Sequence, residues 1–277
     1  MAAKTSPRFP PIRACIFDMD GLLINSEDII TLSINQLLKQ YERPTLPRSI
    51  RAQLMGVPNS TNGDLFHDWA KLPISREQFA RESSERMRLN FRDCEPLAGA
   101  EKLLEDLSHA RNASGNGIKL SLASGTKTHS YELKVSRPET KRLLSFFESD
   151  RRILGDDPRV RGRGKPAPDI YSVALQSLNS LLDPGERNIG ANECLVFEDS
   201  VVGVEAARRA GMRVVWVPHP DMAVEYQGKE KDVLAGRARI DSIEDEWQLG
   251  KIDDGWAESI PSLGHFNYEK YGISIPP

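Results

Sequence analysis

Four short apolar runs, separated by long amphipathic stretches, place the strongest constraint on how this chain can fold. The runs cover residues 12–17, 118–123, 194–197 and 214–217, and they are rich in residues that favour strands. The stretches between them repeat with helical spacing, as in βαβ units. The sequence therefore predicts an α/β fold in which helices cover both faces of a mostly parallel sheet.

One segment interrupts this alternation. From Ser26 to about Cys94 the sequence shows only helical patterns. Ser26 is the expected N-cap of the first helix, because acidic residues follow it in the first turn. Prolines end or interrupt these helices, and Pro96 with Gly99 marks the return to the sheet. We therefore expect an inserted helical cap over residues 25–95.

The other domain boundaries follow from this insertion. We expect the α/β core to comprise residues 12–24 and 96–246, with a flexible N-terminus at residues 1–11. Residues 247–277 form a C-terminal extension that contains scattered aromatic residues without clear periodicity. Such a tail either packs over the surface or remains loose, and its role is not readable from the sequence.

Charge and composition limit the classes of partner. The chain has 277 residues and a formal net charge of −3, which argues against nucleic acid or a membrane surface as a partner. No apolar stretch has the length needed to cross a bilayer, and the first residues lack the apolar segment of a secretory signal. The three widely spaced cysteines are expected to be reduced. We therefore expect a cytoplasmic protein, and we expect a monomer because the sequence gives no firm evidence for oligomerisation.

An acidic pair directly follows the first apolar run. Asp18 and Asp20 lie two residues apart in FDMDGLL, before a glycine that permits a sharp turn. The two carboxylates can share one site as nucleophile and general acid/base if a cation or a shared proton relieves their repulsion. A solvated acidic turn is the alternative, whereas an EF-hand loop is excluded because Gly21 is in the wrong register.

Two later segments carry groups that suit a phosphate ligand. Ser124 and Gly125 follow the second run and can hold phosphate through a hydroxyl and backbone N–H groups, although such turns also serve helix capping. Lys165 lies between a glycine and a proline in GKPAPDI. This rigid setting favours a positioned charge over the solvated lysine that is usual in loops.

A second acidic pair follows the third run. Glu198 and Asp199 lie at the carboxyl end of that predicted strand, where open α/β sheets bind ligands. Oxygen ligands of this kind predict a Mg²⁺ site. The alternative is an acidic first helical turn that interacts favourably with the helix dipole.

Five residues match, in order and in local context, the four signature motifs of the haloacid dehalogenase (HAD) superfamily: Asp18, Asp20, Ser124, Lys165 and Asp199. The resemblance covers roughly residues 12–218. It implies a Rossmann-like parallel sheet core with an inserted small α-helical cap, and a Mg²⁺-dependent phosphatase or phosphotransferase. FDMDGLL, GKPAPDI and CLVFEDSVVGVEAARRAGM are most similar to the pseudouridine 5′-phosphatase group, although sugar-phosphate phosphatases and β-phosphoglucomutases share much of this framework.

The resemblance also implies a role for each residue. Asp18 would be the nucleophile that forms an aspartyl-phosphate, and Asp20 would act as general acid and then base. Lys165, Ser124 and Gly125 would bind the phosphate. The implied Mg²⁺ ligands are Asp18, the backbone carbonyl of Asp20, Asp199 and, as a ligand or a neighbour, Glu198.

Substrate choice is expected to depend on the cap. The candidate substrate contacts, which could equally face solvent, are Arg51, Gln53, Met55 and Asn59. The expected partner is a small phosphorylated metabolite, either a sugar phosphate or a nucleoside phosphate such as pseudouridine 5′-phosphate. A sugar phosphomutase of the β-phosphoglucomutase type and a non-catalytic phosphate-binding module remain alternatives. Release of free phosphate would separate the hydrolase from the mutase, and the complete set of acids with Lys165 argues against the binding module.

Overall fold

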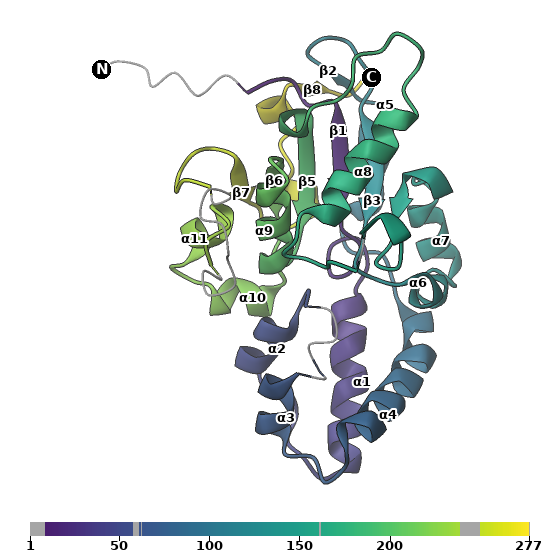
Figure 1. Ribbon diagram of the computed structural model, residues 1–277, viewed down its shortest axis with the longest axis vertical. Coiled ribbons are helices and arrows are strands. Elements are labelled where there is room, and N and C mark those ends of the chain that lie inside the picture. The colour runs from purple at the N-terminus through teal and green to yellow at the C-terminus, as the bar shows by residue number, and fades with distance from the viewer. Residues whose placement is uncertain (1–8, 58–60, 62, 161, 239–249, 277) are drawn as a thin grey trace.

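A parallel sheet of six strands forms the centre of the protein in the computed structural model, which describes residues 9–57, 61, 63–160, 162–238 and 250–276 (Figure 1). In sheet order the strands are β4 (Arg152–Ile153), β3 (Lys119–Ala123), β1 (Ala14–Phe17), β5 (Cys194–Glu198), β6 (Arg213–Trp216) and β7 (Ala257–Ser259). All neighbouring pairs in this sheet are parallel. The predicted α/β fold is confirmed, and the four apolar runs are its central strands.

Side chains of successive residues in each strand point to opposite faces of the sheet, because the side-chain direction of a β-strand alternates with a period of two residues. Ile16 packs on one face with the first group of helices, and Phe17 packs on the other face with the second group. The first group comprises α8 (Asp169–Ser180), α9 (Val201–Arg209), α10 (Pro220–Glu225) and α11 (Glu230–Leu234). The second group comprises α5 (Ala100–His109), α6 (Thr128–Lys134) and α7 (Pro138–Leu144). Both faces of the sheet are therefore covered.

Four helices follow β1 and lie below the sheet in Figure 1, near the carboxyl ends of its strands. They are α1 (Ser26–Gln40), α2 (Arg48–Leu54), α3 (Asp64–Ala70) and α4 (Arg76–Asn90), and a 3₁₀ turn at Phe91–Asp93 ends the series. We call residues 26–93 the helical insertion. It has an apolar cluster of its own, in which the rings of Phe66 and Phe79 lie 4.9 Å apart. None of the helices in the described ranges combines the length and apolarity needed to span a membrane.

The two connections between the helical insertion and the sheet run side by side. Ile24 forms a bridge with Pro96, and the backbone N–H of Asn25 donates to the carbonyl of Glu95 at 3.0 Å. Asn25 occupies the N-cap position of α1, so the capping role expected for Ser26 is wrong. Ser26 is the first helical residue, and its hydroxyl donates instead to the Asp20 carboxylate at 2.6 Å.

The C-terminal extension is part of the core. Strand β7 pairs with β6 at the edge of the sheet, and β8 (Ile273–Ser274) pairs antiparallel with β2 (Arg111–Asn112). In the segment of chain that connects β7 to β8, the ring of Phe266 lies 5.0 Å from that of Phe197 in β5. At the other end of the chain, Phe9 packs edge-on against Trp256. Of the two possibilities left open for the tail, packing against the domain is the one observed.

Candidate active site

A pocket of about 710 Å³ lies between the carboxyl ends of the strands and the helical insertion. Charged residues line its side toward the sheet: Asp18, Asp20, Lys165 and Asp199. Mostly apolar residues line its side toward the insertion, among them Ile30, Ile34, Leu54, Met55 and Met87. Four of the five motif residues, which come from three distant segments of the chain, thus meet at the edge of the sheet where its parallel strands end.

Asp18 and Lys165 form a buried ion pair at the sheet side of this pocket. The Nζ atom of Lys165 lies 2.5 Å from Oδ1 of Asp18, and the side chains are 6% and 7% exposed. Burial raises the pKa of the Asp18 carboxyl to about 7, although Lys165 opposes this shift. Burial would lower the pKa of Lys165, but Asp18 and Glu198 raise it well above its usual value. The lysine is therefore a fixed positive charge next to the carboxylate that follows β1.

Glu198, at the end of β5, is held by protein donors on both of its oxygens. Oε1 accepts hydrogen bonds from Lys165 and from the hydroxyl of Tyr171, and Oε2 accepts from the N–H and hydroxyl of Ser200 at 3.1 Å each. Glu198 thereby orients Lys165 and links it to the start of α9. Its role as a metal ligand stays a prediction.

Asp199 carries a buried carboxylate oxygen, Oδ2, that has no hydrogen-bond partner within the described part of the chain. Burial, together with Glu198 and Asp18, raises the pKa of this carboxyl well above its usual value. Ligand atoms of Asp18, Glu198 and Asp199 all lie within 4.8 Å of one another. This set of hard oxygen donors has more negative charge than Lys165 can balance, so it fits a divalent cation such as Mg²⁺.

Asp20 is surrounded by donors from separate elements. Besides Ser26, its carboxylate accepts hydrogen bonds from Lys134 at 2.5 Å, Thr126 at 2.5 Å and Ser124 at 3.2 Å. Burial alone would raise the pKa of Asp20, but Lys134 and the hydroxyl donors hold it below its usual value. The group expected to act as general acid/base therefore has a defined orientation.

The turn after β3 presents its residues differently from the sequence prediction. Gly125 and Thr126 line the pocket, whereas Ser124 is not among the described residues that line it. The Ser124 hydroxyl accepts from the N–H of Thr126 and donates to Asp20. The phosphate contacts predicted for Ser124 and Gly125 stay predictions, and Thr126 joins them at the pocket wall.

The predicted substrate contacts in the insertion differ in where their side chains lie. Arg51 and Met55 line the pocket, and Met55 is buried. Gln53 is exposed, and its amide donates to the carbonyl of Ser49. Asn59 lies outside the described residues.

The guanidinium of Arg51 bridges the insertion to the core. It pairs with Asp28 in α1 at 2.6 Å and with Asp221 in α10 at 2.7 Å. His219, which precedes α10, lies 3.3 Å from both Arg51 and Asp28. Because these partners already engage Arg51, its contacts explain how α2 is held against the core, and its substrate role stays a prediction.

Sequence reasoning did not identify Lys134 or Tyr171 as site residues, and it included Thr126 in the polar turn after the second run without giving it a role of its own. Tyr171 lies one residue after Ile170 in α8, where it reads as part of an apolar helix face. Lys134 follows Tyr131 by three positions, which places both on the buried face of α6. A lysine at a core-facing position shortly after the Ser124 turn was the signal that could have revealed it.

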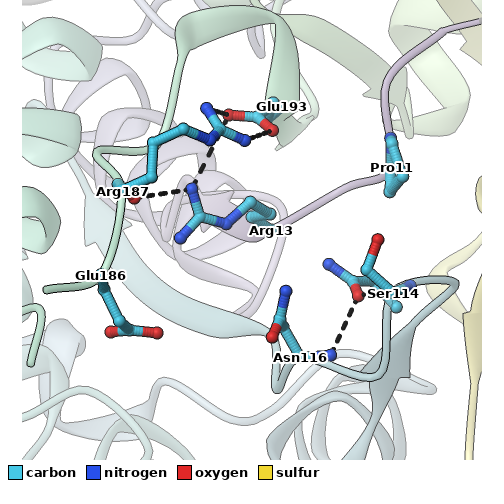
Figure 2. A pocket seen from close by; sticks show the side chains of 8 residues that line it. Pro11, Arg13, Ser114, Asn116, Glu186, Arg187 and Glu193 are labelled. Atoms are coloured by element: carbon cyan, nitrogen blue, oxygen red, sulfur yellow. Dashed lines mark hydrogen bonds and ion pairs between the residues drawn. The ribbon is translucent and has the colours of Figure 1, made fainter.

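A second pocket of about 290 Å³ lies at the opposite edge of the sheet, where the strands begin. Figure 2 shows bonds among Arg13, Arg187 and Glu193, and none between Glu186 and the other residues drawn. Arg187 pairs with Glu193 at 2.6 Å, and Arg13 donates to the carbonyl oxygens of Arg187 and Asn188. These contacts hold the loop before β5, and the pocket that contains Asp18 and Lys165 lies at the other edge.

Known proteins are similar to this chain in both sequence and fold. Residues 15–217 match the model of the haloacid dehalogenase-like hydrolases. A Saccharomyces cerevisiae protein named a probable pseudouridine-5′-phosphatase is 34% identical over 241 residues, covering 87% of this chain and 96% of the relative. The mitochondrial (DL)-glycerol-3-phosphatase 1 of Arabidopsis thaliana is also 34% identical, covering 86% of this chain and 74% of the relative.

A solved structure of a HAD hydrolase of family IA from Entamoeba histolytica has the same fold, with a TM-score of 0.62. It is 21% identical, and the match covers 94% of this chain and 97% of that one. The resemblance inferred from the motifs is confirmed, and the chain belongs to the haloacid dehalogenase-like hydrolase family.

Proposed function

We propose that this protein is a Mg²⁺-dependent phosphomonoester hydrolase that acts through an aspartyl-phosphate on Asp18. One observation carries the proposal: a buried Asp18–Lys165 pair opens into a pocket beside a second carboxylate, Asp199, whose buried Oδ2 atom has no hydrogen-bond partner in the described structure. A nucleophile, a fixed cation and a site for a divalent metal are the groups that phosphoryl transfer requires.

The chain's own residues account for the proposed steps. The Asp18 carboxylate attacks phosphorus while the bond from phosphorus to the leaving oxygen breaks. Lys165, held by Glu198, offsets charge on the transferring oxygens. Asp20, when its carboxyl group is protonated, gives its proton to the departing oxygen and later accepts one from the water that hydrolyses the aspartyl-phosphate.

The predicted cofactor has suitable ligands in Asp18, Asp199 and the backbone carbonyl of Asp20. When bound, Mg²⁺ would neutralise charge on the phosphate oxygens and orient the phosphate. The orphaned Oδ2 of Asp199 supports this proposal, because an unpaired buried carboxylate is costly without a counter-charge.

The helical insertion is proposed to act as a cap that closes over the bound substrate. Its two connections lie together at Asn25 and Glu95, which is the arrangement of a hinge. Its own apolar cluster would let it move as one body. Closure would exclude water from the reacting groups.

The proposed substrate is a small phosphate ester with a largely uncharged organic part. The insertion side of the pocket is mostly apolar, which suits a nucleoside better than a second phosphate group. Relatives named pseudouridine-5′-phosphatase make pseudouridine 5′-phosphate the first candidate, and glycerol 3-phosphate follows from the Arabidopsis relatives. The expected monomeric state and cytoplasmic location stay predictions.

Phosphate release from a panel of phosphomonoesters tests the proposal. We expect release in the presence of Mg²⁺, little or none after EDTA, and restoration when Mg²⁺ is added back. Asp18→Asn should abolish turnover, because the amide is a poor nucleophile. Turnover without phosphate release, with transfer to a second sugar position, would instead identify a mutase. Binding of phosphate without turnover would contradict the enzyme assignment.

A further inference from the structure

A buried lysine outside the four motifs lies against Asp20. Lys134 is the last residue of α6, and its side chain is 4% exposed. Its Nζ atom lies 2.5 Å from Oδ1 of Asp20 and 2.8 Å from Oγ1 of Thr126. The ammonium group also lies 4.6 Å from the ring centre of Phe91, where the insertion returns to the sheet. Because burying an ammonium group is costly unless it is paired, this position indicates a specific task.

The hydrogen bonds of Asp20 define that task. Oδ1 accepts from Ser26 and Lys134, and Oδ2 accepts from Thr126 and Ser124. Lys134 is the charged donor of this set, and it also bonds Thr126 on the other side of the carboxylate. Hydrogen bonds to ionised groups are shorter and stronger than neutral ones. Lys134 therefore contributes most to fixing the orientation of Asp20.

The two buried lysines of the pocket contact different carboxylates. Lys165 contacts Asp18 and Glu198, whereas Lys134 contacts Asp20. On the mechanism proposed above, Asp18 bonds to phosphorus and Asp20 handles the proton of the leaving group. One buried lysine thus contacts the proposed nucleophile, and the other contacts the proposed acid/base.

We propose that Lys134 is a positioning residue for Asp20 in leaving-group departure, an inference that rests on the proposed phosphatase function. In that step the bond between Asp18 and phosphorus forms, the bond from phosphorus to the leaving oxygen breaks, and the proton of Asp20 passes to that oxygen. Lys134 holds the carboxyl group in place and stabilises the carboxylate that remains after the proton has left.

This role makes the effect of Lys134 depend on the leaving group. An alkyl phosphate releases an alkoxide, which needs the proton from Asp20. p-Nitrophenyl phosphate releases a stable phenolate, which does not. The ratio kcat/KM reports on steps up to leaving-group departure, so it isolates this contribution from the later hydrolysis of the aspartyl-phosphate.

The experiment compares kcat/KM of wild type and Lys134→Met for p-nitrophenyl phosphate and for the best alkyl phosphate of the substrate panel. We expect a loss of about 100-fold for the alkyl ester, in the range of general acid catalysis, and little change for the aryl ester. Asp20→Asn should show the same difference, and Asp20→Asn combined with Lys134→Met should lose no more than Asp20→Asn alone. Lys141→Met, on the exposed side of α7, is the matched control and should leave both values unchanged.

The outcomes are separable. Equal losses for both esters would overturn the inference, because Lys134 would then act on the transferring phosphate or on the fold. Absence of phosphate release from either ester by wild type would overturn the proposed function itself. If Lys134→Met does not fold, Lys134→Gln keeps a hydrogen-bond donor toward Asp20, and circular dichroism verifies its fold before the same comparison is made.

Discussion

At Gly203, in the first turn of α9, the carboxyl group of Glu198 occupies the space of a side chain. A Cβ atom built at this position would lie 1.9 Å from that carboxyl group. Glu198 in turn holds Lys165 beside Asp18. The absence of a side chain at Gly203 is therefore coupled to the position of Lys165.

We predict that Gly203→Ala lowers both stability and activity. The helix gains up to about 1 kcal/mol from alanine, but displacing a buried, fully bonded Glu198 should give a net loss of about 1–3 kcal/mol. A shift of Lys165 should lower kcat by about 100-fold, as small misplacements in active sites do. Urea unfolding and phosphate release measure the two effects.

Gly117→Ala is the matched control, because a Cβ atom there meets nothing within 4 Å. Its stability and kcat should equal those of wild type. A Gly203→Ala protein with normal kcat would show that Glu198 does not position Lys165.

The sequence could predict site residues whose chemistry follows from their place at strand ends. Asp18, Asp20 and Asp199 were found in this way, Lys165 was found from its rigid setting between a glycine and a proline, and all four meet at the pocket. Lys134 and Tyr171 were missed because the burial of a polar side chain depends on tertiary packing, which helical spacing alone does not give. Ser26 was misread for a related reason: a serine near a helix start resembles a cap, whereas here it bonds to Asp20.

At the scale of secondary structure elements, Arg51 joins α2 and α1 of the insertion to α10 of the core. Sequence patterns predicted the insertion as a helical segment because its apolar spacing is regular. They could not predict its docking, which depends on charges brought together from residues 28, 51 and 221.

We predict that Asp221→Asn loosens α2 without unfolding the protein. A partly exposed ion pair contributes about 0.2–1 kcal/mol, so amide hydrogen exchange in α2 should accelerate by about 1.4- to fivefold. Exchange within α5 should stay unchanged, because local opening involves only the contacts that are lost. Hydrogen exchange followed by mass spectrometry resolves the two helices.

The exposed pair of Arg142 with Glu101 supplies the control for this experiment. Arg142→Gln should leave exchange in α2 at the wild-type rate. Equal protection of α2 in Asp221→Asn and wild type would mean that Arg51 does not hold the insertion against the core.

For the whole molecule, the C-terminal extension completes the hydrophobic core that supports the site. Phe266 lies between Phe197 of β5 and Tyr271, and Phe197 stacks on Phe17, the residue before Asp18. The sequence did not predict this packing, because β7 and β8 are short and their pairing partners are distant in the chain. Such long-range pairing leaves no local periodic signal.

We predict that Phe266→Ala destabilises the whole domain by about 3–5 kcal/mol, the usual cost of removing a buried phenylalanine. The loss should appear as a lower midpoint of urea unfolding followed by tryptophan fluorescence. Ile275→Ala, at a side chain that is 39% exposed, should leave the midpoint within experimental error. If the two variants unfolded at the same urea concentration, the C-terminal extension would cover the core without contributing to its stability. A loss confined to Phe266→Ala would instead show that the stacked rings from β1 to the tail unfold as one cooperative unit, so that the carboxylate after β1 depends on residues far along the chain.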